Sequence, residues 1–254
     1  MENGHVVIVG GTSGSGRALV RRFARRCEVS LLGRHPSPEI EQRLPRVHFY
    51  PTDLADLEAV RETVARCVER SGKIAHLVFY QRYRGKGDSW EGEIQVSLTA
   101  TKTLVELCAE HFDCDSHPSI VMVSSVASRL ILAEQPVSYH AAKAAINHMM
   151  RYYAVTLGPK GIRVNAVSPD SVIKDESRKF YEENRPLREL YESITPLGRM
   201  GTAEDVAHVV EFLCSPQAAF VTGQEIVVDG GLSLVGQAAV ARRVANLDRL
   251  KITR

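Results

Sequence analysis

The sequence predicts an α/β protein built on a doubly wound, seven-stranded parallel sheet flanked by helices, and three observations carry this prediction. Short apolar, β-rich segments alternate with longer segments of helical period along the chain. Several of the short segments are apolar on both faces, as expected of strands that helices cover from each side. No internal repeat or low-complexity linker divides the 254 residues. We therefore expect a single domain.

The expected elements follow one another in regular order. The expected strands are residues 5–9, 28–33, 47–50, 76–80, 119–124, 162–166 and 225–228. The helices expected between them are residues 16–26, 57–71, 94–111, 137–157 and 203–214.

Two segments fall outside this alternation. Residues 175–195 are charged and aromatic, and we expect an insertion over the carboxyl ends of the strands, where ligands bind in such sheets. The tail, residues 237–254, carries Val240, Val244 and Leu247 at helical spacing. It is expected to form a short amphipathic helix that docks on another surface.

Composition limits the classes of function. With 44% hydrophobic and 24% charged residues, the chain is typical of soluble globular proteins. No apolar segment approaches the ~20 residues of a membrane span, and the start lacks the pattern of a signal peptide. A net charge of +2 without a long basic block does not indicate a nucleic-acid partner. Five cysteines without C-x-x-C spacing predict neither a disulfide framework nor a metal site, and they favour a cytoplasmic location.

A glycine-rich loop follows the first expected strand. It reads Gly-Gly-Thr-Ser-Gly-Ser-Gly from Gly10 to Gly16 and leads directly into a helix. Glycines at such a turn let the backbone approach a pyrophosphate, and the helix start offers free N–H groups. The spacing is G-x-x-x-G-x-G and differs from the G-x-G-x-x-G dinucleotide fingerprint. The position between strand and helix favours a nucleotide site over plain turn geometry.

The ends of the second and third strands bear on the choice of nucleotide. Arg34 closes the second strand, and no acidic residue appears before Glu39. An arginine at this place suits the 2′-phosphate of NADP, although Arg34 could also be a solvated loop residue. Asp53 and Leu54 follow the third strand, where an aspartate could meet the adenine amino group or cap the helix that starts near Leu57.

A serine, a tyrosine and a lysine form the candidate catalytic set. Ser125 follows the fifth strand, and Tyr139 and Lys143 lie one turn apart on the next helix. A lysine ammonium beside a phenol favours the phenolate and lowers its pKa, which suits a general acid or base.

With the glycine loop, these motifs make the chain resemble the short-chain dehydrogenase/reductase family over nearly its whole length. The matching stretches are residues 9–16, Asp53-Leu54, 123–127, Tyr139 with Lys143, 161–169, 195–199 and 222–231. The resemblance implies a Rossmann-like fold that binds NAD(P) across the strand ends. It also implies a homodimer or homotetramer packed through helices 94–111 and 137–157.

The same resemblance assigns roles to individual residues. Tyr139 would protonate a carbonyl oxygen or deprotonate an alcohol, and Lys143 would hold the nicotinamide ribose and lower the pKa of Tyr139. Ser125 would orient the substrate oxygen, with Ser124 as the alternative, and Ser97 occupies the place of a fourth catalytic residue, an asparagine in the family. The cofactor-binding residues implied are Gly10, Thr12, Ser13, Ser15, Gly16, Arg34, Asp53, Leu54, Tyr139, Lys143 and Val172.

The chain departs from the family pattern at three places. The stretch that usually reads N-N-A-G ends here on Tyr80, Gln81 and Arg82, the asparagine is Ser97, and a nicotinamide-contacting threonine aligns with Lys174. These changes surround the nicotinamide end and leave the phosphate end intact. We infer that nucleotide binding is retained and that the reaction or substrate is specialised.

The sequence thus predicts an NADP(H)-dependent oxidoreductase that interconverts a carbonyl and an alcohol on a small molecule. Arg82, Arg84 and Lys86 beside the site allow an anionic or carrier-tethered substrate, or they form a solvated loop. The alternatives are a nucleotide-binding regulatory or scaffold protein without turnover, and a dehydratase or epimerase on the same fold. No nucleic-acid or membrane partner is expected.

Overall fold

The computed structural model describes residues 4–36, 40, 44–85 and 89–247, and its centre is a seven-stranded parallel sheet. The strand order is β3-β2-β1-β4-β5-β6-β9, and each neighbouring pair is parallel. The predicted fold class is confirmed. Because the chain passes from β3 back across β1 to β4, a topological switch point lies between β1 and β4, where ligands bind in open α/β sheets.

The strands of the sheet are β1 (His5–Val9), β2 (Glu28–Gly33), β3 (Val47–Pro51), β4 (Ile74–Phe79), β5 (Ser119–Val123), β6 (Arg163–Pro169) and β9 (Glu225–Val228). A separate two-stranded sheet pairs β7 (Val172–Ile173) with β8 (Gly201–Thr202). The helices are α1 (Gly14–Phe23), α3 (Leu57–Ser71), α4 (Ser89–Glu93), α5 (Ala100–Cys108), α6 (Val137–Leu157), α7 (Asp175–Glu183), α8 (Arg185–Ile194), α9 (Ala203–Cys214) and α10 (Gln237–Val244).

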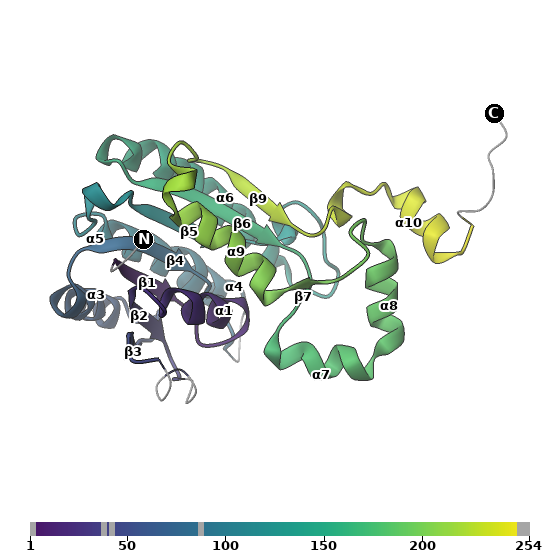
Figure 1. Cartoon of the computed structure of the whole chain (residues 1–254), viewed down its shortest axis with the longest axis horizontal. Coiled ribbons are helices and arrows are strands. Elements are labelled where there is room, and N and C mark those ends of the chain that lie inside the picture. The colour runs from purple at the N-terminus through teal and green to yellow at the C-terminus, as the bar shows by residue number, and fades with distance from the viewer. Residues whose placement is uncertain (1–3, 37–39, 41–43, 86–88, 248–254) are drawn as a thin grey trace.

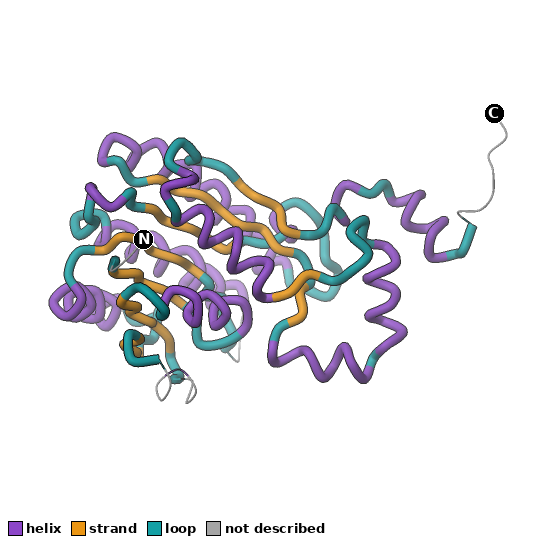
Figure 2. The backbone as a smooth tube through the Cα atoms, in the orientation of Figure 1, coloured by secondary structure: helices purple, strands orange, loops and turns teal. Residues whose placement is uncertain are grey.

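Helices cover both faces of the sheet and enclose two apolar layers (Figures 1 and 2). One layer packs α1 and α9 against the sheet around Phe23, Leu31 and Val210. The other packs α3, α5 and α6 around Leu77 and Met150. Since both faces are buried, β1 and β4 contain only buried residues, which explains why their sequences do not alternate.

The segment expected as one helix over residues 94–111 is more complex. The chain enters it through α4, continues as a π-helix, η1 (Ile94–Thr99), and becomes α-helical only from Ala100 to Cys108. The prediction of a single continuous helix is therefore wrong. A π-helix adds a residue to the turn and rotates the side chains that follow, a distortion often found at functional sites.

The charged segment 175–195 forms two helices, α7 and α8, which extend beyond the main body with α10 (Figure 1). Tyr181 contacts Phe180 and Tyr191 edge-on, with ring centroids 5.2 and 6.5 Å apart. The guanidinium of Arg243 on α10 donates to the backbone oxygens of Ser193 and Ile194 at the end of α8. The tail therefore packs on its own subunit as far as it is described, and residues 248–254 of the predicted tail lie outside the described residues.

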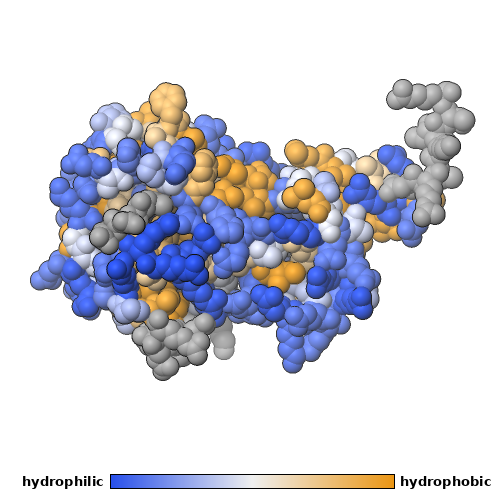
Figure 3. Space-filling model, viewed as in Figure 1, coloured by the Kyte–Doolittle hydropathy of each residue, from blue (hydrophilic) through white to orange (hydrophobic). Residues whose placement is uncertain are grey.

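Hydrophobic side chains remain exposed near β9 and towards α10, as Figure 3 shows for one face. Phe220, which precedes β9 in the chain, and Leu234, which lies between β9 and α10, are the two most exposed large apolar residues. Among the helices that the structure describes, none has both the length and the apolar character needed to cross a membrane. No disulfide joins any of the cysteines in the described residues, and only Cys114 is exposed.

Candidate active site

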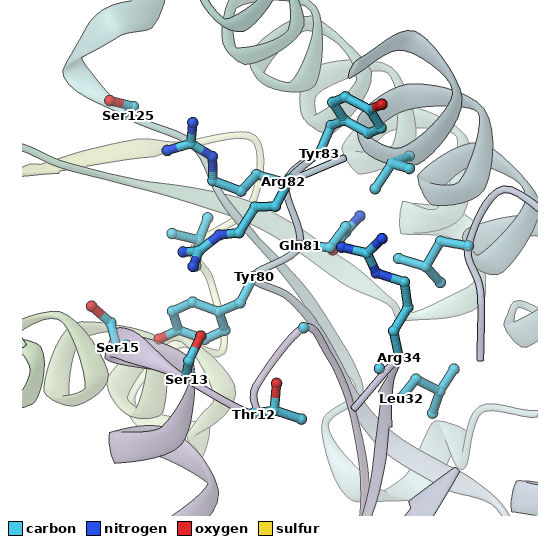
Figure 4. A pocket seen from close by; sticks show the side chains of 18 of the residues that line it. Thr12, Ser13, Ser15, Leu32, Arg34, Tyr80, Gln81, Arg82, Tyr83 and Ser125 are labelled. Carbon is cyan, nitrogen blue, oxygen red and sulfur yellow. The ribbon is translucent and has the colours of Figure 1, made fainter. Parts of the chain in front are cut away.

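A cavity of about 520 Å³ opens at the carboxyl ends of the central strands (Figure 4). Its size lies in the usual range for small-molecule sites, about 300–1,000 Å³. With the exception of Ser97, every residue predicted for cofactor binding or catalysis lines this cavity. Ser13 and Ser15 lie at one end of it, Ser125 lies at the other, and Arg82 lies on the Ser125 side of Tyr80 (Figure 4).

The glycine loop is shaped by close backbone contacts. Gly10 has φ +81°, and a Cβ at this position would lie 2.6 Å from the backbone nitrogen of Gln81. A Cβ on Gly16 would lie 2.7 Å from the Cα of Gly11. Only glycine fits these positions, so the loop lies flat against the end of β4 and aims the N-terminus of α1 at the cavity. Ser13, the N-cap of α1, makes no side-chain cap. This cradle, with free donors at a helix start, fits the pyrophosphate of a dinucleotide.

A carboxylate from α7 already contacts this cradle. The backbone N–H of Gly14 donates to both carboxylate oxygens of Glu176, at 3.2 and 3.3 Å, and Arg17 forms an ion pair with the same group. The side chain of Lys174 lies over Gly14, since a Cβ added to Gly14 would be 3.3 Å from Cδ of Lys174. Neither contact is predicted from the sequence, in which Glu176 is one acid of a charged segment. The carboxylate sits where an anion is favoured by the helix dipole.

The adenosine end of the cavity contains Arg34 and Asp53. Arg34 is exposed at the end of β2 and lines the cavity near Leu32 and Gln81 (Figure 4). The carboxylate of Asp53 accepts from the backbone N–H of Ala55 at 3.0 Å, a local turn contact. The helix cap is Asp56, so the alternative of Asp53 as the cap of α3 is wrong.

Lys143 is buried beside Tyr139 on α6. Its ammonium donates to the backbone oxygen of Val123 at 2.9 Å and lies 5.7 Å from the centre of the Tyr139 ring. Burial lowers the pKa of Lys143 to about 8, the charge of Glu93 opposes this shift, and the charge of Arg82 adds to it. The protonation state of Lys143 therefore depends on the opposing charges of Glu93 and Arg82, which lie elsewhere in the chain.

The two adjacent serines at the end of β5 are held differently. The hydroxyl of Ser124 donates to the backbone oxygen of Lys143 at 3.1 Å and ties β5 to α6. The oxygen of Ser125 accepts from the backbone N–H of Ala127 at 3.2 Å, which leaves its own proton free to donate. Of the two, Ser125 is the serine that can still donate a hydrogen bond to a bound oxygen.

Ser97 lies behind the cavity wall and does not line it. Its hydroxyl donates to the carboxylate of Glu93 at 2.6 Å, and both residues are buried. Ser97 belongs to the π-helical segment η1, and its hydroxyl reaches back four positions to Glu93, the last residue of α4. Ser97 can therefore act on the site only through Glu93, whose charge reaches Lys143. Glu93 was not predicted as a site residue, and the one signal for it is an acid four positions before Ser97.

Arg82 stacks on Tyr139. Its guanidinium carbon lies 4.7 Å from the ring centre, on a residue that is half-buried. The two preceding residues, Tyr80 and Gln81, bury a hydroxyl and an amide oxygen that have no hydrogen-bond partner among the described residues. Burial and the charge of Arg82 lower the pKa of Arg84. Lys86, the third member of the predicted basic stretch, lies outside the described residues.

Fold and site together define a dinucleotide-binding α/β protein, and comparison with known proteins gives the family. Residues 10–233 match the family model described as enoyl-(acyl carrier protein) reductase. L-rhamnose 1-dehydrogenase (NAD(P)(+)) of Sphingomonas sp. (strain SKA58) is 32% identical over 248 residues, which cover 91% of this chain and 97% of that protein. The 3-oxoacyl-(acyl-carrier-protein) reductase of Thermotoga maritima is 31% identical over 240 residues, with coverage of 89% and 96%.

Solved structures agree with this placement. The ligand-free aldohexose dehydrogenase of Thermoplasma acidophilum superposes with a TM-score of 0.81 at 25% identity, covering 93% of this chain and 96% of that one. A short-chain dehydrogenase/reductase of Brucella melitensis described as glucose/ribitol dehydrogenase gives 0.78 at 30% identity, covering 91% and 97%. The chain belongs to the short-chain dehydrogenase/reductase family and is an enzyme of that family. No group of three or more His, Cys, Asp or Glu side chains is placed to hold a metal ion in the described part of the chain.

Proposed function

We propose that the protein is an NADP(H)-dependent oxidoreductase that interconverts a carbonyl and an alcohol, with Tyr139 as the general acid and base. The observation that carries the proposal is the arrangement of one cavity. One end of the cavity holds the glycine loop and Arg34, and the other end holds Ser125, Tyr139 and Lys143. A dinucleotide that lies along this cavity would bring its nicotinamide to the Tyr139 end.

The cofactor-binding residues divide along the cavity. Gly10, Thr12, Ser13, Ser15 and Gly16 would hold the pyrophosphate and the nearby ribose. We assign Arg34 to a 2′-phosphate, because a guanidinium pairs with phosphate oxygens through two parallel hydrogen bonds.

The remaining cofactor contacts lie further along the wall. Asp53 and Leu54 would border the adenine, and Val172, Tyr139 and Lys143 would border the nicotinamide ribose. All five line the cavity. In the sequence, no acidic residue follows the end of β2 before Glu39, which supports the preference for NADP(H).

In the reducing direction, NADPH held by the glycine loop, Arg34 and Lys143 would supply a hydride for the carbonyl carbon, and the protein would supply the proton and the orientation. The Ser125 hydroxyl would donate to the substrate oxygen and hold it at the Tyr139 phenol. The phenol proton passes to that oxygen as the alcohol forms, and the phenolate is stabilised by the Lys143 ammonium. Glu93 and Ser97 act as positioning residues, because the carboxylate favours the charged form of Lys143.

The decisive experiment is Tyr139→Phe, which keeps the ring and removes the acidic proton. NADPH consumption is measured with neutral ketones and 3-oxoacyl thioesters, and NADP⁺ reduction is measured with aldoses, because the relatives are named for sugar and 3-oxoacyl substrates. Turnover should fall by ~10²–10⁴-fold while NADPH still binds.

Three other results would point elsewhere. Retained turnover in Tyr139→Phe would move the proton transfer to another group. NADPH binding without turnover of any substrate would support the regulatory or scaffold alternative. Conversion of a substrate without net consumption of cofactor would support a dehydratase or epimerase.

The remaining expectations concern assembly and location. We propose a homodimer or homotetramer, supported by Tyr152 and Val155, which are exposed apolar residues on α6. Sedimentation of the full chain would test this, and a monomer at all concentrations would contradict it. The cysteines form no disulfide in the described part of the chain, which supports a cytoplasmic location, where thiols stay reduced.

A further inference from the structure

Positive charge dominates the lining of the active-site cavity. Among the described lining residues, two are acidic, Asp53 and Asp170. Five are cationic, and these are Arg34, Arg82, Arg84, Lys143 and Lys174. Like charges held together in a partly buried site repel one another and destabilise the free protein, so this excess favours anionic ligands.

The cofactor accounts for the cations at one end only. Lys174 lies over Gly14 of the phosphate loop, and Arg34 closes β2, so both face the expected positions of cofactor phosphates. Arg82 is placed differently, because its guanidinium stacks on the ring of Tyr139 at 4.7 Å. It belongs to the end at which the reaction would take place.

Arg82 is also poorly paired. Among the described residues it takes part in no ion pair, and its one hydrogen bond is a long one, 3.5 Å, to the side-chain oxygen of Gln135. Its Nε is buried and finds no hydrogen-bond partner in the described residues. Together with burial, its charge also lowers the pKa values of three other cations, Arg84, Lys143 and Lys174. Within the part of the chain that the structure describes, this half-buried guanidinium therefore has no counter-ion.

We propose that Arg82 binds a carboxylate of the substrate and that the substrates are therefore oxo acids and hydroxy acids. This inference rests on the proposed function, whose substrate class it specifies. The carbonyl oxygen that Tyr139 protonates must lie within about 2.6–3.2 Å of the phenol oxygen. A carboxylate one or two bonds from the carbonyl carbon then falls beside the guanidinium above the same ring.

The reaction written for this substrate class is balanced. Hydride from NADPH forms a C–H bond at the carbonyl carbon, the C=O π bond breaks, and the phenol proton of Tyr139 passes to the oxygen. A 2- or 3-oxo acid becomes the corresponding hydroxy acid, NADPH becomes NADP⁺, and Tyr139 recovers its proton from solvent. The carboxylate keeps its charge throughout, so Arg82 serves as a specificity-determining residue and transfers no proton.

The test compares acids with their methyl esters, which keep the carbon skeleton and remove the charge. Pyruvate and acetoacetate, each paired with its methyl ester, are assayed with saturating NADPH in the wild type, Arg82→Gln and Arg82→Lys. We expect the wild type to prefer at least one acid, and Arg82→Gln to lower kcat/KM for that acid by ~10²-fold, mainly through KM, because a charge-paired contact is lost. The effect on the ester should stay within a few-fold. Arg82→Lys keeps the charge without the planar fork and should recover part of the preference.

Arg34→Gln is the matched control, because it removes one cation from the other end of the same cavity. It should raise the KM for NADPH and leave the ratio of acid to ester unchanged at saturating cofactor. If Arg82→Gln fails to fold, the acid-to-ester ratio of the wild type still tests the proposal.

Each remaining outcome has one meaning. Equal kcat/KM for acids and esters in the wild type, or equal losses for both in Arg82→Gln, would overturn the assignment of Arg82 and leave the reductase proposal intact. Failure to oxidise NADPH with any acid, ester, ketone or 3-oxoacyl thioester, together with failure to reduce NADP⁺ with aldoses, would instead refute the proposed function itself.

Discussion

The carboxylate of Glu176 on the phosphate loop should compete with the cofactor, and Glu176→Gln tests this directly. The substitution keeps the shape of the side chain and removes its charge. In the free protein the carboxylate accepts from the Gly14 N–H and pairs with Arg17 at the N-terminus of α1. A cofactor pyrophosphate would require the same donors or would lie close to the negative charge. The variant should therefore bind NADPH more tightly than the wild type.

The expected size of the change in Kd follows from the solvent exposure of the ion pair between Glu176 and Arg17. The side chain of Glu176 is 45% exposed and that of Arg17 17% exposed, so solvent screens their attraction. An exposed ion pair contributes ~0.2–1 kcal/mol. A carboxylate at a helix N-terminus contributes ~0.3–1 kcal/mol. Their sum is about 1 kcal/mol, and because 1.4 kcal/mol corresponds to tenfold in affinity, the Kd for NADPH should fall roughly fivefold.

Titration of NADPH fluorescence measures this change. Asp175→Asn is the matched control, because Asp175 precedes Glu176 on the same helix but pairs with Arg21 and Arg178, at 3.2 and 3.7 Å. It should leave the Kd within about twofold, since these exposed ion pairs are weak and make no contact with the loop. Added salt should reduce the difference between Glu176→Gln and the wild type. An unchanged or weaker affinity in Glu176→Gln would refute competition between the carboxylate and the cofactor.

Four further predictions concern other parts of the molecule. Arg34→Ala should weaken NADPH binding by about tenfold or more and NADH binding by less than about twofold, because only NADPH has a 2′-phosphate to pair; equal losses in the two titrations would contradict this role. Glu93→Gln removes the carboxylate that raises the pKa of Lys143, so the alkaline limb of the kcat/KM profile should move to lower pH, and an unshifted limb would show that Glu93 does not act on Lys143. The pKa of Lys143 is about 8 in the folded protein and ~10.4 in the unfolded chain, so the unfolded state binds more protons between these pH values. The contribution of Lys143 therefore makes the free energy of unfolding rise with pH across that window. Lys143→Met should flatten this rise in denaturant titrations. Deletion of residues 237–254 should lower the melting temperature or change the sedimentation profile, and a tail that contributes nothing would alter neither.

Most of the fold could be predicted because the sequence pattern of each strand or helix depends mainly on residues close together in the chain. A buried parallel strand is apolar on both faces, and this pattern marks β1 and β4 without knowledge of their neighbours. The ends of elements depend on distant contacts, and there the prediction was less accurate. The expected strand 162–166 continues as β6 to Pro169, because Ala166 to Pro169 pair with β9, which lies far along the chain.

The residues of the candidate site also differ in whether the sequence alone can predict them. The glycine loop and the pair of Tyr139 and Lys143 are short motifs, so their placement on one cavity could be expected from the sequence. Glu176 and Gly14 are 162 positions apart, and no local pattern indicates that they meet. Ser97 and Glu93 are four positions apart and can meet locally, but no local pattern indicates that the charge of Glu93 reaches Lys143, which lies 50 positions further along the chain. Contacts of this kind follow from the fold and become visible only once it is known.

The charge of the cavity connects these separate observations. Arg82, Arg84 and Lys143 lie near one tyrosine, and their mutual repulsion with partial burial lowers the stability of the free protein. A ligand that binds only the folded state recovers stability in proportion to the logarithm of its concentration over its Kd. Both ligands that we propose are anions, and they neutralise opposite ends of the cavity. A neutral substrate would offer Arg82 nothing to bind, and the repulsion around Tyr139 would persist through the reaction.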